Sequence, residues 1–201
     1  MGEMIDNIEI IMRKNTEIIV ATTNKHKLAE IGKILPCPIK GVYIIVKEDG
    51  KTFAENALKK ARAAARKFGK ISIADDSGLV VEALNGRPGV RSARFTRPGT
   101  SDNLCKKLLR LMKNKTNRSA HFVCAIAIAS PAGFEKVVIG KCFGQINFEM
   151  LGEKGFGFDS VFIARGARKT FAQMSSSAKN RISHRRAALD KFKKINLKKI
   201  T

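Results

Sequence analysis

Two adjacent carboxylates, Asp75 and Asp76, are the side chains of this sequence best suited to chemistry. They follow the apolar segment 71–74, which is typical of a buried strand, and Gly78 comes shortly after them. Two carboxylates at the end of a buried strand are costly to desolvate without a cation, and Mg²⁺ accepts one or two carboxylates together with substrate phosphates. The pair indicates a metal site, although an acidic turn is an equally good interpretation of this run alone.

A second candidate cluster, residues 22–27 (TTNKHK), lies where an apolar strand predicted for residues 17–22 meets the start of a helix. Backbone N–H groups at such a junction, together with hydroxyls and a lysine, are suited to holding phosphate. The glycines of a Walker loop are missing. Taken alone, an ordinary helix N-cap with solvated lysines is the better interpretation.

Two further clusters lie near the C-terminus. In residues 152–159 (GEKGFGFD), glycines surround two phenylalanines and could expose a ring on which a nucleobase stacks, a contact of ~1–3 kcal/mol; a turn with core phenylalanines is the simpler alternative. Residues 179–186 (KNRISHRR) place cations at a predicted helix start, where they oppose the helix dipole. A bound anion would explain that placement, and a plain basic helix end is the alternative.

The elements that must position these clusters alternate between strands and helices early in the chain, with a hairpin in the middle. This order predicts an α/β fold with a mixed sheet. The expected strands are residues 17–22, 42–46 and 71–74 and the pair 121–129 and 134–148, which turns at residues 131–133. The expected helices begin at Asn24, at Glu55 behind a capping box of Thr52 and Glu55, at a capping Ser101, and after Ser183.

The charge is strongly positive, with 39 lysines and arginines against 17 acids and a net charge of +22. Such a balance favours polyanionic partners, either nucleic acid or small molecules that carry phosphate. It does not choose between them, because no zinc finger, helix-turn-helix or aromatic RNA motif accompanies it.

Length and composition are those of a globular protein of 201 residues. The four cysteines lie far apart without a CxxC pair, which favours buried free thiols over disulfides or a zinc site. Residues 1–16 lack the apolar core of a signal peptide, so we expect an N-terminal extension, a single domain over residues 17–201 and a cytoplasmic location.

Together and in this order, the four clusters resemble the inosine triphosphate pyrophosphatase family over residues 18–192. The most specific stretch is residues 74–95 (ADDSGLVVEALNGRPGVRSARF), supported by the T-x-N-x-x-K start, GFGFD and ISHR. The resemblance implies a central mixed sheet flanked by helices, two lobes with the active site in the cleft between them, and a homodimer. It also implies Mg²⁺-dependent hydrolysis of deaminated purine nucleotides (ITP, dITP, XTP) to the monophosphate and pyrophosphate, which cleanses the nucleotide pool.

The resemblance also assigns roles residue by residue. Asp76 matches the general base linked to the metal, Asp75 its supporting partner, and Glu48 (or its neighbour Lys47) the place of a further acidic metal ligand. The positions that match substrate contacts are Thr22, Thr23, Asn24, Lys25, His26, Lys27 and Ser77, then Phe156, Gly157, Phe158 and Asp159 for the base, and Lys179, His184 and Arg185 for the phosphates and purine. A donor such as Arg185 or His184 would favour the 6-oxygen of a deaminated purine.

The sequence departs from the family pattern at three positions. Phe158 stands where tyrosine or tryptophan is common, Ser160 replaces a usual proline and Ala178 a usual glutamate. None of these is the proposed base, so the departures bear on specificity rather than on hydrolysis. The rival interpretations are a pyrophosphatase of the same type that acts on other modified nucleotides and a basic nucleic-acid-binding protein.

Overall fold

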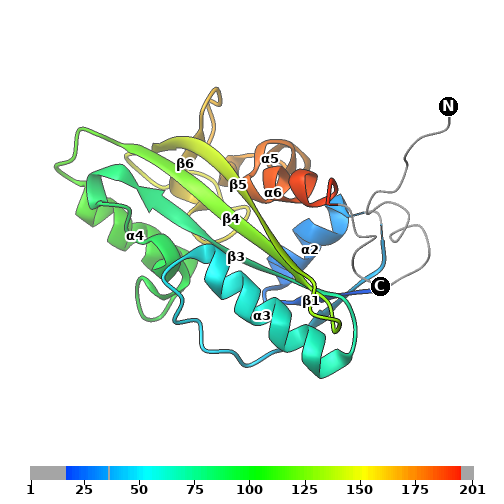
Figure 1. Cartoon of the computed structure of the whole chain (residues 1–201). Helices are drawn as coiled ribbons and strands as arrows, with labels where there is room; N and C mark the ends of the chain where they lie inside the picture. Colours follow the sequence, from blue (N-terminus) through cyan, green and yellow to red (C-terminus); the bar gives the residue numbers. More distant parts are fainter. Residues whose placement is uncertain (1–16, 36, 196–201) are drawn as a thin grey trace. The chain divides into compact units, whose positions relative to one another are not determined.

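The described residues form a mixed six-stranded sheet with helices, which confirms the expected α/β class (Figure 1). The strand order is β2-β1-β3-β4-β5-β6, with β1 parallel to β2 and β3, and β5 antiparallel to β6. The computed structural model describes residues 17–35 and 37–195, so the extension expected at residues 1–16 lies outside the described residues. The elements are β1 (Ile18–Ala21), α2 (Lys25–Ile34), β2 (Ile39–Val42), α3 (Phe53–Phe68), β3 (Ser72–Val81), α4 (Ser101–Met112), β4 (Ser119–Ala129), β5 (Glu135–Ile146), β6 (Phe162–Ala164), α5 (Ser176–Ile182) and α6 (His184–Phe192).

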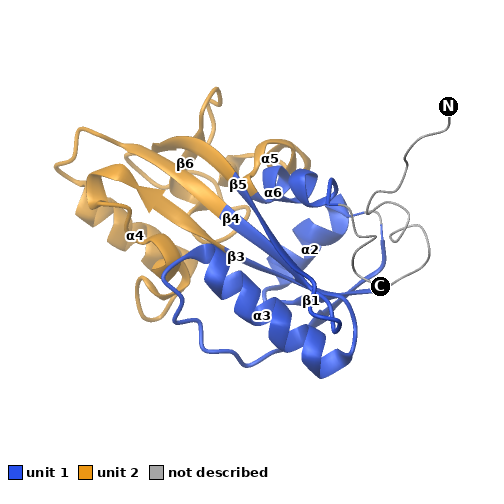
Figure 2. Ribbon diagram, viewed as in Figure 1, with its two compact units in different colours: residues 1–76, 124–140, 185–201 blue, residues 77–123, 141–184 orange. Residues whose placement is uncertain are grey.

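The chain divides into two compact units (Figure 2). The first takes in the described residues up to 76, together with 124–140 and those from 185 onward, and the second takes in 77–123 and 141–184. The boundary on β3 falls between Asp76 and Ser77, within the acidic motif itself. The single catalytic domain over residues 17–201 and an active site between two lobes stay predictions.

In the first unit, alternate residues of each strand enter two different cores, as the two-residue period of a strand requires. On β1, Ile18 and Val20 pack with α2 and α6, whereas Ile19 and Ala21 pack with the alanine-rich face of α3. The other strands of the unit repeat this division. Ile73, Cys124, Ile126 and Ile128 belong to the core with α2 and α6, and Ala74, Ala125, Ala127 and Ala129 to the core with α3.

The second unit has a core of its own, built on an amphipathic helix and clustered phenylalanines. Leu104, Leu108 and Met112 recur at four-residue spacing on α4 and are buried with Leu79 and Val81 of β3. Three rings close the same core, Phe122, Phe162 and Phe171, whose centroids lie 4.7 to 6.0 Å apart. Of the four cysteines, which are all free, Cys105, Cys124 and Cys142 are buried, as expected.

Two strands differ from their predicted limits. The second strand covers Ile39–Val42 rather than 42–46, because it pairs with β1 and the last paired residue, Val42, faces the last residue of that strand, Ala21. The third strand does not end at residue 74 but continues through both aspartates to Val81. We expected the strand to end before the two charged side chains. Each aspartate has polar partners, however, and these allow it to be buried within the strand.

Helix limits differ as well. The helix α3 begins at Phe53 instead of Glu55. Thr52 Oγ1 accepts from the Glu55 backbone N–H (3.1 Å), but the Glu55 carboxylate accepts from the Lys51 N–H rather than closing the expected box. Thr100, not Ser101, caps α4. The short helix α5 and the strand β6 carry no strong periodicity and were not expected.

Gly78 marks a close approach of β3 to the segment that follows it, because Ser92 Oγ accepts from the Leu79 N–H (2.9 Å) and donates to the Gly89 carbonyl (2.7 Å). A Cβ on Gly78 would lie 2.6 Å from that carbonyl oxygen and 2.8 Å from Ser92 Cβ. We therefore predict that Gly78→Ala lowers the free energy of unfolding by about 1–3 kcal/mol in urea titrations.

The matched control is Gly32→Ala on α2, where an added Cβ would meet only the flexible Ile39 side chain, at 3.2 Å. We expect a change below about 1 kcal/mol there, since alanine also favours the helix. An equal loss in both variants would contradict the close approach at Gly78.

Candidate active site

The two adjacent aspartates point to opposite sides of β3. Ile73 belongs to the core with α2 and α6 and Ala74 to the core with α3, so Asp75 follows Ile73 and Asp76 follows Ala74 by the two-residue period. Their partners agree with this division. Asp75 contacts Lys27 of α2 and Arg185 of α6, whereas Asp76 contacts two residues of α3.

Asp75 is held as a carboxylate by two cations, the buried Arg185 and the partly buried Lys27. Its Oδ2 lies 2.9 Å from Lys27 Nζ and accepts from Arg185 Nη2 at 3.0 Å, and the Arg185 guanidinium also pairs with Glu30 of α2. Asp75 is 1% exposed and Arg185 is fully buried. Burial by itself raises the pKa of Asp75, but the charges of Lys27, Arg185 and Lys60 outweigh it and hold that pKa well below its usual range. Asp75 therefore stays ionised and serves to position cations.

Asp76 has the opposite balance. Burial raises the pKa of Asp76, and Lys60, Lys27 and a hydrogen bond from Asn56 Nδ2 (3.2 Å) offset this only in part. The nearby Glu48 carboxylate adds to the rise. Asp76 is thus a desolvated carboxylate with raised proton affinity, as a general base requires.

Glu48 and Asp76 share a lysine. Lys60 Nζ lies 3.0 Å from Glu48 Oε1 and 3.8 Å from Asp76 Oδ1. Burial alone lowers the pKa of Lys60, yet the carboxylates of Asp75, Asp76 and Glu48 raise it above its usual value. Among the described residues, no group of three or more histidines, cysteines or acids could hold a metal by itself. The local donor set is therefore two carboxylates, which suits Mg²⁺ when phosphate oxygens complete the coordination.

The 22–27 segment begins α2 with a regular N-cap. Asn24 Oδ1 accepts from the N–H groups of His26 (3.0 Å) and Lys27 (3.1 Å), and Thr22 Oγ1 accepts from the Asn24 N–H (3.2 Å). The alternative interpretation of an N-cap is thus correct for the backbone. Lys27 nevertheless points to Asp75, so the segment delivers one cation to the acidic pair, while Thr23, Lys25 and His26 are exposed.

In the second unit, a buried ion pair organises the glycine-rich segment. Lys179 Nζ donates to Asp159 Oδ2 at 2.6 Å, both side chains are about 5% exposed, and the same oxygen accepts from the Phe156 N–H at 2.9 Å. Lys179 Nζ also lies 4.8 Å from the centre of the Phe156 ring. Phe156 is partly exposed beside this charge, whereas Phe158 is 3% exposed and packs in the core, 6.2 Å from Phe95.

The basic segment near the C-terminus is arranged differently from the expectation. Lys179 lies in the last turn of α5, where a cation favours the helix dipole, and not at a helix start. His184 begins α6 and is 5% exposed, with its ring stacked on Phe122 at 4.7 Å and 13°. Arg185 follows it and belongs to the first unit with Asp75.

The structure thus brings the expected residues together in two groups. In the first unit Lys27, Glu48 and Arg185 lie around the Asp75–Asp76 pair within β3. In the second unit Phe156, Asp159 and Lys179 form one cluster, while Ser77 lies partly exposed on β3. Sequence reasoning missed Glu30, Asn56 and Lys60. Asn56 and Lys60 could have been found from their four-residue spacing, which places two polar side chains on one face of an otherwise alanine-rich helix.

The opposite settings of the two aspartates predict opposite effects on stability. Asp75→Asn leaves Arg185 and Lys27 without their buried carboxylate, and we expect a loss of about 3–5 kcal/mol in the free energy of unfolding from urea titrations. Asp76→Asn removes a charge that burial disfavours, so we expect no loss, or a gain. A larger loss for Asp76→Asn than for Asp75→Asn would refute this assignment of roles.

Comparison with known proteins agrees with this geometry. The sequence profile of the Ham1 family matches residues 18–195. A dITP/XTP pyrophosphatase of Desulfotalea psychrophila is 44% identical over 185 residues, which cover 88% of this chain and 83% of the relative. One of Desulforamulus reducens is 44% identical over 192 residues, 89% of this chain and 94% of the relative.

Solved structures agree as well. The Staphylococcus aureus Ham1 protein has a TM-score of 0.81 at 40% identity, covering 89% of this chain and 96% of its own. A nucleoside-triphosphatase / dITP/XTP pyrophosphatase of Mycobacterium abscessus has a TM-score of 0.72 at 38% identity, covering 88% and 98%. The resemblance expected from the four clusters is confirmed, and this chain belongs to the Ham1 family.

Proposed function

We propose that this protein hydrolyses deaminated purine nucleoside triphosphates, dITP, ITP and XTP, to the monophosphate and pyrophosphate. Relatives named dITP/XTP pyrophosphatases are 42–44% identical over 87–89% of the chain. The observation that carries the proposal is the division of the acidic pair, in which Asp75 pairs with Lys27 and Arg185 and its neighbour Asp76 has a raised pKa.

The proposed base is Asp76. Its raised pKa suits it to take a proton at a carboxylate oxygen from the water that attacks the triphosphate, and Asn56 holds that carboxylate in place. Asp75 supports it from the other side of the strand, where it orients Lys27 and Arg185. The two carboxylates therefore have separate tasks because their environments push their pKa values apart.

Asp76 and Glu48 are the residues that would hold Mg²⁺. Both lie near the Lys60 ammonium, at 3.0 Å for Glu48 and 3.8 Å for Asp76, which supports a common cation site. When bound, Mg²⁺ lowers the pKa of a coordinated water and offsets phosphate charge. Lys60 adds positive charge beside Glu48 and Asp76, and Lys27 adds it beside Asp75. The proposed phosphate contact is the N-cap segment of Thr22, Thr23, Asn24, Lys25 and His26.

The proposed role of the second unit is to bind the nucleobase of the substrate. Phe156 is the better candidate than Phe158 for stacking, because Phe156 is partly exposed and Phe158 is a core residue. Asp159 positions Lys179 beside the Phe156 ring, and Gly157 lies between the two phenylalanines. Ser77, His184 and Arg185 complete the proposed substrate contacts; a donor among them would favour a 6-oxo purine, whereas adenine carries an amino group at that position.

The rest of the proposal concerns assembly and location. We propose a homodimer in the cytoplasm that cleanses the nucleotide pool. In the described part of the chain, no helix has the length and apolar character needed to cross a membrane. A pyrophosphatase for other modified nucleotides is the second candidate; its support in the sequence was Phe158, which the structure places in the core.

The direct test is a release assay for pyrophosphate with ITP, XTP, GTP, ATP and dUTP, with and without Mg²⁺. We expect Mg²⁺-dependent turnover of ITP and XTP well above that of GTP and ATP. Asp76→Asn should reduce turnover by at least about 100-fold while the protein stays folded, since it removes the general base. Preferential turnover of dUTP would favour the second candidate, and retained activity in Asp76→Asn would exclude that residue as the base.

Stacking on Phe156 can be tested separately. Phe156→Ala should raise the KM for ITP about 5- to 100-fold because it removes the proposed ring contact, whereas Phe156→Tyr should keep most of the affinity. Phe143→Ala, which removes an exposed phenylalanine from β5, is the matched control and should leave KM unchanged. An unchanged KM in Phe156→Ala would assign the stacking to another side chain.

A further inference from the structure

A second group of polar and aromatic side chains lies on the exposed side of β4 and β5 in the second unit. Ile146 N–H donates to the Arg118 carbonyl (2.9 Å), and the His121 and Phe143 rings lie 5.2 Å apart, so these two residues share one side of the paired strands. The opposite side carries the buried Phe122 and Cys142. Because side chains alternate along a strand, Lys141 and Gln145 point the same way as Phe143.

Two exposed phenylalanines are each accompanied by an arginine: Phe143 lies on this side of β5, and Phe148 comes two residues after the end of the strand. Phe148 is 79% exposed, with the Arg118 guanidinium 4.2 Å from its ring centre, and Phe143 is 48% exposed, with Arg165 at 5.6 Å. Exposed phenylalanines cost hydrophobic free energy that a ligand could recover. An aromatic ring beside a guanidinium offers both a stacking surface and a positive charge.

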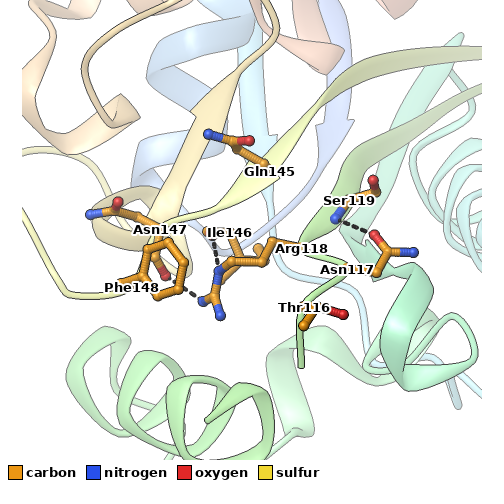
Figure 3. Close-up of a pocket in the computed structure, with 8 residues that line it drawn as sticks. All are labelled: Thr116, Asn117, Arg118, Ser119, Gln145, Ile146, Asn147 and Phe148. Atoms are coloured by element: carbon orange, nitrogen blue, oxygen red, sulfur yellow. Dashed lines mark hydrogen bonds between the residues drawn. The ribbon is translucent and has the colours of Figure 1, made fainter. Parts of the chain in front are cut away.

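The Phe148–Arg118 pair borders a pocket with a volume of about 390 Å³ (Figure 3). Arg118 is fixed there, because its Nε and Nη2 donate to the carbonyls of Ile146 (2.6 Å) and Asn147 (2.7 Å). Figure 3 shows the polar groups of Asn147, Gln145 and Asn117 around the same space. The pocket is large enough for a small planar ligand, and the exposed Gln145 amide can bond to the edge of a nucleobase.

The charge of this side favours a polyanion. Arg118, Lys141 and Arg165 carry three positive charges here, against two neighbouring acids, Glu82, which accepts from Asn117, and Glu149, which follows Phe148. The whole chain carries a net charge of +22. A second copy docked here by two-fold symmetry would place like charges against one another, whereas a phosphate backbone would complement them.

We propose that this β4–β5 face, formed by Arg118, His121, Lys141, Phe143, Phe148 and Arg165, binds single-stranded nucleic acid. Bases stack on Phe148 and Phe143, and the three cations follow the phosphates, the combination used by sequence-tolerant single-strand binders. A duplex is a poorer ligand because its bases already stack on one another. The site is separate from the pyrophosphatase residues, so its test does not depend on turnover.

The test is fluorescence anisotropy of the full chain with labelled oligo(U) and oligo(dT) of about 12 nucleotides, within the usual site size of such binders, and with a duplex of equal length. We expect Phe148→Ala and Phe143→Ala each to weaken single-strand binding about 5- to 100-fold, with Phe148→Tyr close to wild type. Lys141→Ala should reduce the slope of log affinity against log salt by about 0.7.

The matched control is Phe68→Ala, which removes another exposed phenylalanine with a lysine near its ring, Lys67 at 5.7 Å, from the first unit. Its binding and the ITP turnover of all these variants should match wild type. The proposal is overturned by equal losses in Phe68→Ala and Phe148→Ala, by duplex binding as tight as single-strand binding, or by no binding. A change of oligomeric state on light scattering in Phe148→Ala would also overturn it, because it would assign the face to a contact between copies.

Discussion

The burial of one charge, the Asp75 carboxylate, is the constraint on which the first unit depends. Removing a carboxylate from water costs several kcal/mol after all relaxation, so Asp75 can lie inside β3 only if cations meet it there. Lys27 of α2 and Arg185 of α6 supply these cations, and the Arg185 guanidinium forms a second ion pair with Glu30. One strand and two helices, far apart in the chain, are thereby brought to a common point.

That constraint also explains how Asp76 differs from its neighbour. The cations of α2 and α6 pair with Asp75. On the other side of the strand, Asp76 contacts Asn56 and Lys60 of α3, and Glu48 contacts the same lysine. Burial raises the pKa of Asp76, the nearby Glu48 carboxylate adds to the rise, and the lysines and Asn56 offset it only in part. A single strand therefore separates a structural carboxylate, Asp75, from the proposed base, Asp76, without any change of residue type.

The second unit uses the same principle on a smaller scale. The Asp159–Lys179 pair is buried, and it fixes the Phe156 backbone and the position of a cation beside the Phe156 ring. On the β4–β5 face of the same unit, arginines lie beside exposed phenylalanine rings and not beside buried carboxylates. Buried charges with partners define the enzyme site, and exposed charges beside aromatic rings define the proposed nucleic-acid surface.

Local signals in the sequence determined the elements that depend on local chemistry. Asn24 and Thr52 cap their helices, Gly69 ends α3 with a left-handed backbone, and the turn before Phe134 closes the hairpin, all as short-range preferences require. The four clusters, read together, also identified the family. Burial and pairing between distant residues were decided only by the tertiary structure. The continuation of β3 through Asp75 and Asp76 depends on partners that no neighbouring residue indicates, and the two-residue period then sends the carboxylates to opposite sides.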